Sequence, residues 1–188
     1  ILFEPFAGYG FGKAHAACYA TIAFRTAYLK AHFPAEFMTA LLTAESRGTT
    51  GPVKNEKISQ AVAECKRLNV EVLPPDINKS DSEFAIEDKI KIRFGLSAIK
   101  NVGEAAIRNI LENRGKGLFK TFEDFCQRVD LSTINKKTVE SLIKAGAMDS
   151  FGKRAKLLMD YPEIVDKASK KKKEGESGQE SLFGDDDP

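Results

Sequence analysis

The sequence predicts a mainly α-helical protein with a small β-hairpin or short sheet. Helical spacing is clear in segments such as 56–68, where Ile58, Val62 and Cys65 fall on one face. One stretch, 90–94, instead alternates apolar and polar residues, as a strand does. The final residues are polar and charged, and such a composition predicts a flexible tail because it cannot bury a core.

The predicted helices follow one another along the chain. They span 13–30, 35–44, 56–68, 104–113, 122–129 and 136–145, with a last helical stretch from about 153. The first break falls at Phe33, because a proline disfavours helical angles in the residue before it. Thr121 begins a capping-box-like start, Asn135 can cap the helix that follows it, and Gly146 is placed to end that helix.

A short β-rich region lies between the helical blocks. Residues 70–73 predict a strand, which two consecutive prolines stop. Segments 84–86 and 90–94 predict a hairpin, since both are rich in β-branched and aromatic residues. We therefore expect a minor sheet beside the helices.

Composition and charge narrow the classes of protein that the chain can represent. The net charge of +2 gives no sign of a nucleic-acid binder by itself. The three cysteines are far apart and form no CxxC pair, which favours reduced thiols over a disulfide or zinc site. His15 and His32 have no metal-ligand partner at a suitable spacing. The apolar stretch 14–24 is shorter than the roughly 20 residues that a membrane helix needs. We expect a cytoplasmic protein with no membrane partner and no metal or cofactor in this segment.

The segment 6–20 is punctuated by Gly8, Gly10 and Gly12 directly before a helix. A glycine loop that opens a helix can present free N–H groups and a positive dipole end to an anion. The spacing matches neither GxGxxG nor a Walker A loop. The residues alone leave two interpretations open, a loop close to phosphate or a tight loop that caps a buried helix.

The sequence of this segment, FAGYGFGKAHAACYA, resembles part of the fingers of C-family replicative polymerases, the alpha subunits of bacterial DNA polymerase III. Gly12 and Ala14 replace the usual Asn and Ser of the family. The resemblance implies a parent DNA-directed DNA polymerase that uses Mg²⁺ held by palm aspartates. We find no such aspartate cluster, expect it upstream, and expect no catalytic residue or activity in this segment. Lys13 and His15 are implied to lie near the nucleotide or the template strand.

Two further segments, 96–110 and 130–147, resemble the tandem helix-hairpin-helix module of the same family. In the first segment Gly103 is expected to permit the tight turn of the hairpin, so that N–H groups at the start of the next helix meet a phosphate oxygen. The second segment lacks the hairpin glycine but offers two lysines at its helix start. The residues that we predict to bind duplex DNA are Lys100, Asn101, Gly103, Lys136 and Lys137. The alternative is that the hairpins only pack.

The tail carries Gln179-Glu-Ser-Leu-Phe183, which resembles the peptide by which bacterial proteins bind the β sliding clamp. Leu182 and Phe183 would enter a hydrophobic pocket, with Gln179 and Ser181 in register beside them. Two large apolar residues in a charged tail otherwise lack a structural reason. The resemblance therefore implies the sliding clamp and other replicase subunits as partners.

We expect the chain to be a piece of a larger protein, because it has no initiator Met and begins in apolar sequence. Its expected parts are a helical end of the fingers (1–47), a connecting helix with short strands (48–95), the tandem helix-hairpin-helix module (96–150), a C-terminal helix (151–168) and a flexible tail with the clamp-binding peptide (169–188). The alternative is a stand-alone helix-hairpin-helix protein for DNA repair or scaffolding, without polymerase activity.

Overall fold

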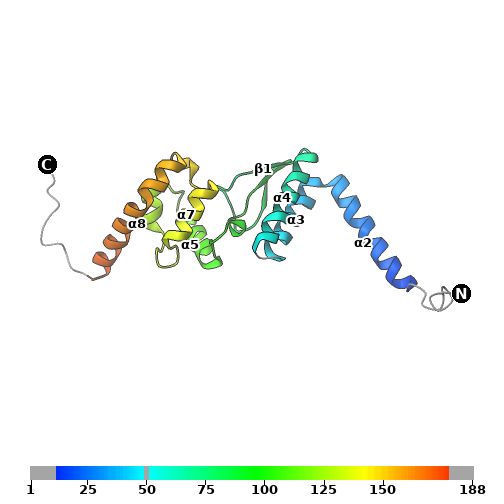
Figure 1. Ribbon diagram of the computed structural model, residues 1–188, viewed down its shortest axis with the longest axis horizontal. Helices are drawn as coiled ribbons and strands as arrows, with labels where there is room; N and C mark the ends of the chain where they lie inside the picture. The colour runs from blue at the N-terminus through cyan, green and yellow to red at the C-terminus, as the bar shows by residue number, and fades with distance from the viewer. Residues whose placement is uncertain (1–11, 49–50, 178–188) are drawn as a thin grey trace.

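The computed structural model describes residues 12–48 and 51–177 and shows an elongated molecule (Figure 1). The helices are α2 (Lys13–His32), α3 (Pro34–Gly48), α4 (Gly51–Arg67), α5 (Glu104–Gly115), α6 (Phe122–Arg128), α7 (Lys136–Ala145) and α8 (Arg154–Ser177), with short 3-10 turns η1 (Leu96–Ala98) and η2 (Asp149–Phe151). The strands are β1 (Glu71–Leu73), β2 (Ala85–Asp88) and β3 (Lys91–Arg93). The prediction of a mainly α fold with a small β part is confirmed.

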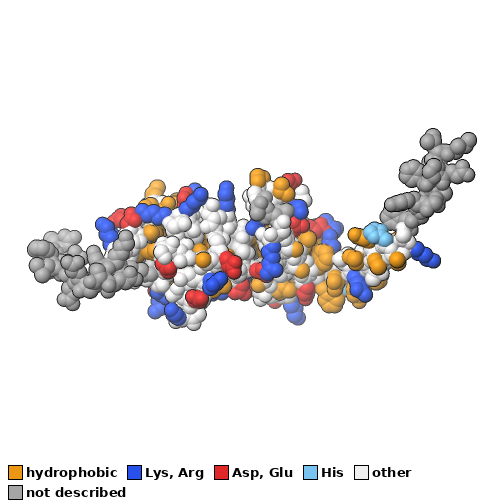
Figure 2. Space-filling view, turned by 90° about the horizontal axis from the view of Figure 1, so that it is seen from below, with side chains coloured by type: hydrophobic (Ala, Val, Ile, Leu, Met, Phe, Trp, Pro, Cys, Tyr) orange, Lys and Arg blue, Asp and Glu red, His pale blue; other side chains and the backbone are white. Residues whose placement is uncertain are grey.

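The helix α2 projects from one end of the molecule (Figure 1). None of its residues is buried against the rest of the described chain, and its apolar side chains include Tyr19 and Phe24, which are 61% and 71% exposed. Figure 2 shows such hydrophobic side chains on the surface of this projecting helix. An ion pair of 2.7 Å between Lys30 and Glu64 ties its C-terminal end to α4. Hydrogen bonds from Arg67, and then from Lys30, lower the pKa of Glu64 to about 2.

An N-terminal lobe is formed by α3, α4 and the sheet. The sheet has the order β1-β3-β2, with β1 parallel to β3 and β2 antiparallel to it. Its core joins Met38 and Leu42 of α3, Ile58 of α4 and Ile92 of β3, all of which are buried. The sheet thus gives the two helices an apolar surface to pack on. The helices in turn stabilise the short strands, which would not be stable alone.

A C-terminal lobe is formed by α5 to α8 around a second core. Phe125 of α6 and Leu142 of α7 are fully buried at its centre, and Val165 of α8 packs against them. Arg128 stabilises the loop after α5, because its guanidinium donates to the carbonyls of Asn113, Gly117 and Leu118. One guanidinium thus binds three backbone carbonyls and holds the end of α5 and the loop after it together.

The segment after β1 connects the two lobes. The N–H of Ile77 donates to the carbonyl of Ala147 (2.7 Å), and the side chain of Asn78 exchanges two hydrogen bonds of 2.9 Å with the backbone of Phe119. Phe94, which follows β3, packs against both cores. The lobes are therefore joined by buried contacts as well as by the chain itself.

Several helices are longer than the sequence predicted. The helix α3 spans Pro34–Gly48, where 35–44 was expected. The helix α4 begins at Gly51, because Pro52 lies in its first turn, where a missing N–H costs nothing. The helix α8 continues through Pro162 and past the predicted end at 168, to Ser177. Val165 and Ala168 pack on the core beyond the proline and hold those turns in place. The division of the chain into five parts stays a prediction. No helix in the described ranges is long and apolar enough to cross a membrane.

Gly95 lies between β3 and η1, and close packing leaves no room for a side chain there. Its replacement tests this packing. A Cβ atom at this position would lie 2.4 Å from the backbone carbonyl carbon of Glu83. We expect Gly95→Ala to lower the free energy of unfolding by about 1–3 kcal/mol, the usual cost of overpacking. Urea unfolding followed by circular dichroism measures this change.

Gly103→Ala is the matched control, because a Cβ atom at Gly103 would meet no heavy atom within 4 Å. We expect it to change the free energy of unfolding by less than about 1 kcal/mol. Equal stability of the two variants would contradict the packing described for Gly95.

Candidate nucleic-acid interface

The first hairpin runs from η1 to the start of α5, and Asn101 makes its tight turn. Asn101 has a φ of 63°, in the left-handed region, which asparagine tolerates better than most residues. Gly103 has an extended conformation, with φ −84° and ψ 164°. The expectation that Gly103 supplies the turn is wrong, because the left-handed residue stands two positions earlier.

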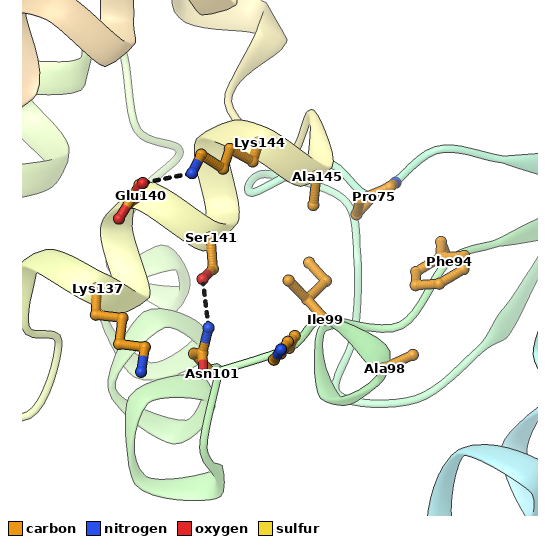
Figure 3. A pocket seen from close by; sticks show the side chains of 11 residues that line it. Pro75, Phe94, Ala98, Ile99, Asn101, Lys137, Glu140, Ser141, Lys144 and Ala145 are labelled. Atoms are coloured by element: carbon orange, nitrogen blue, oxygen red, sulfur yellow. Dashed lines mark hydrogen bonds and ion pairs between the residues drawn. The ribbon is translucent and has the colours of Figure 1, made fainter. Parts of the chain in front are cut away.

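Asn101 also joins the first hairpin to α7. Its carbonyl accepts a hydrogen bond of 3.0 Å from the hydroxyl of Thr138, and its amide donates to Ser141 Oγ at 3.0 Å (Figure 3). Thr138 is buried, so its hydroxyl is satisfied only through this contact and the nearby Asn135. The side chain of Asn101 is thus used within the protein, and the two hairpins are held side by side.

The start of α5 is open. No side chain among the described residues caps it, and Glu104, the one acidic residue of its first turn, is exposed. Its Ncap is Gly103, and a Cβ atom at this position would meet no heavy atom within 4 Å. A helix start of this kind presents unsatisfied donors and the positive end of the helix dipole.

The start of α7 differs, because it is already capped. The side chain of Asn135 accepts a hydrogen bond of 3.0 Å from the N–H of Thr138, as the sequence predicted. Gly146 ends the same helix with a φ of 88°, also as predicted. The two hairpins are therefore unequal, and only the first leaves its following helix without a side-chain cap.

A cavity of about 690 Å³ lies between the first hairpin and α7 (Figure 3). Three lysines line it, Lys100 from the hairpin and Lys137 and Lys144 from α7. The carboxylate of Glu140 pairs with Lys144, and this hydrogen bond raises the pKa of the lysine. Neither of the other two lysines forms an ion pair within residues 12–48 and 51–177, so the cavity carries unbalanced positive charge.

The structure brings most of the predicted DNA-binding residues together. Lys100, Asn101 and Lys137 line the cavity, and Gly103 lies two residues beyond Asn101 at the start of α5. Lys136 is directed elsewhere, since its Nζ pairs with Asp166 of α8 at 2.8 Å. Their role in DNA binding stays a prediction.

Among the cavity residues that sequence reasoning missed are Ser141 and Lys144. They follow Lys137 by four and seven residues on one helix, so they share its face. That spacing was a usable signal once the helix 136–145 had been predicted.

The other predicted site residues do not join this cluster. Lys13 and His15 lie in the first turn of α2, at the far end of the molecule from the hairpins (Figure 1). The ring of His15 lies 4.4 Å from that of Tyr19. The clamp-binding residues 179–183 lie outside the described part of the chain. Their roles stay predictions.

Comparison with known proteins identifies the region that contains the cavity. Residues 69–157 match the model of a helix-hairpin-helix motif. The chain is 43% identical over 185 residues to the DNA polymerase III subunit alpha of Thermus aquaticus, covering 98% of this chain and 15% of the relative. The corresponding protein of Campylobacter jejuni is 46% identical over 190 residues, with 99% and 15% covered. That of Vibrio cholerae is 45% identical over 185 residues, with 97% and 15% covered.

The chain thus spans about 15% of the length of these relatives. The similarity extends over nearly all of its residues, including the projecting helix as well as the hairpins. This chain belongs to the family of DNA polymerase III alpha subunits, as a segment that contains a helix-hairpin-helix motif.

Proposed function

We propose that the hairpin module of this chain grips duplex DNA through phosphate groups, without regard to sequence, as part of a replicative DNA polymerase. The observation that carries the proposal is the open start of α5 beside a lysine-lined cavity. Unsatisfied N–H groups favour a phosphate oxygen, and Lys100 and Lys137 add charge on the same side. Such contacts fix the position of a duplex but carry no information about its bases.

The wider activity is assigned to the parent protein. We assign nucleotidyl transfer, and the Mg²⁺ that it uses, to aspartates outside this segment, as the family resemblance implies. Within the described ranges no group of three His, Cys, Asp or Glu could hold a metal ion. The segment is expected to bind DNA without extending a primer.

A second part of the proposal is a tether to the β sliding clamp. The helix α8 ends at Ser177, two residues before Gln179. Clamp and duplex would then be held by two weak contacts on one chain, and linkage raises the effective concentration of each. Other replicase subunits are expected partners of the parent protein, because the family resemblance implies them.

Two alternatives make different predictions. A stand-alone repair or scaffold protein is disfavoured, because alpha subunits align with 97–99% of this chain. A block whose hairpins only pack is favoured by the contacts of Asn101 with α7. Such a block would show no steep dependence of DNA affinity on salt, whereas phosphate contacts produce one.

Lys137→Gln tests the duplex grip. We expect this variant to bind every duplex more weakly by a similar factor, roughly 5- to 10-fold at 0.1 M salt, because one phosphate contact is lost. The slope of log affinity against log salt should fall by about one. Fluorescence anisotropy with two duplexes of different sequence measures both quantities.

Lys66→Gln is the matched control, because it removes the same charge away from the hairpins. Lys66 lies in the last turn of α4, beside β1. It should bind each duplex within about twofold of the original chain. A loss at Lys137 that depended on the sequence of the duplex would contradict a grip on the backbone.

The tail is tested by Leu182→Ala combined with Phe183→Ala. We expect the double variant to lose clamp binding, because both apolar anchors are removed, while its affinity for duplex DNA stays unchanged. Titration with the purified β sliding clamp provides the measurement. Asp185→Ala combined with Asp186→Ala changes the same tail outside the motif and should leave clamp binding intact. Clamp binding that survived in the Leu182 and Phe183 variant would remove this part of the proposal.

A further inference from the structure

A second cavity of about 430 Å³ lies where the two lobes meet. The first turns of α4 form one wall, through Lys54 and Asn55, and the first hairpin forms the other. The two cavities share the hairpin segment 98–101 as a common wall. The hairpin is therefore bordered on one side by α7 and on the other by α4, which belongs to the N-terminal lobe.

A direct contact holds α4 against the hairpin. Lys54 Nζ donates a hydrogen bond of 3.3 Å to the carbonyl of Ser97 in η1. The hydroxyl of Ser97 is buried and has no hydrogen-bond partner among the described residues. The ammonium group of Lys54 is thus held at the edge of the hairpin by a single long bond, which leaves its other two N–H donors available.

The charge of this cavity has one sign. Its lining includes Lys54 and Lys100 and no carboxylate. In the neighbouring cavity the one carboxylate, Glu140, is already neutralised by Lys144. Three lysines that form no ion pair within the described residues, Lys54, Lys100 and Lys137, thus border two adjoining cavities, and positive charge of this kind attracts a polyanionic backbone.

We propose that α4 is part of the DNA interface, with Lys54 and Asn55 contacting a phosphate group next to the one held by the first hairpin. The inference rests on the proposed function, and it extends the duplex-binding surface from the hairpin module into the N-terminal lobe. Lys54 supplies a charge-assisted contact, and Asn55, which is exposed, can donate through its amide. The bonded contact between Lys54 and Ser97 then also orients the two lobes on the duplex.

Lys54→Glu in the complete chain tests this proposal. We expect its affinity for a duplex of mixed sequence to fall roughly 5- to 10-fold or more at 0.1 M salt, and the salt slope to fall by about one. The control Lys66→Glu makes the same change of charge on the same helix, about 18 Å further along its axis. It should stay within about twofold of the original chain.

Lys54→Glu also breaks the hydrogen bond to Ser97, and this alone could weaken DNA binding. Asn55→Glu is the second variant, which separates the two causes. It adds a negative charge to the same cavity and leaves Lys54 in place, so it should also weaken duplex binding several-fold while circular dichroism and thermal unfolding stay unchanged.

Weaker binding by both variants supports the proposal. If the original chain binds duplex, Lys137→Gln weakens it, and both α4 variants bind normally, then the α4 contact is wrong and the hairpin grip stands. If the original chain shows no salt-dependent binding, the hairpin grip fails and this inference fails with it.

Discussion

The hydrogen bonds of Asn101 to α7 are the constraint on which the candidate interface depends. One residue closes the turn of the first hairpin in the left-handed conformation, accepts a bond from Thr138 and donates one to Ser141. These bonds fix the start of α5 relative to α7, and so place an uncapped helix end beside the lysines of α7. Since Thr138 is buried, loss of this contact would leave its hydroxyl with only the longer bond of 3.3 Å to Asn135, and weakly satisfied polar groups in a core are costly.

The second constraint is the connection between the lobes. Asn78 binds the backbone of Phe119 through both ends of its amide, and Phe94 packs against both cores. These contacts keep α4 next to the first hairpin, where Lys54 reaches the carbonyl of Ser97. The sheet is small, but it positions the helices that carry the lysines. The matched motif begins at residue 69, so it includes the sheet as well as the hairpins.

Local signals in the sequence predicted the fold class and several helix ends well. Asn135 and Gly146 cap α7 through hydrogen bonds with residues three or four positions away, and both occupy the predicted cap positions. Longer-range effects were not visible. The continuation of α8 past Pro162 depends on Val165 reaching the core, and the pairing of Lys136 with Asp166 depends on where α8 lies. The turn residue was misassigned because glycine is the usual choice for unusual angles, whereas asparagine fills that role here. The cavity itself could not be predicted, since its walls come from segments far apart in the chain.

In the proposed complex, backbone N–H groups at the start of α5 receive a phosphate group of duplex DNA. Nuclear magnetic resonance of the ¹⁵N-labelled chain, titrated with two duplexes of equal length and different sequence, tests it most directly. We predict that the amide signals of Glu104 and Ala105 move strongly, and by similar amounts for both duplexes, because they meet the backbone rather than the bases. Saturated duplex binding that left these two amide signals in place would mean that the start of α5 does not bind the phosphate.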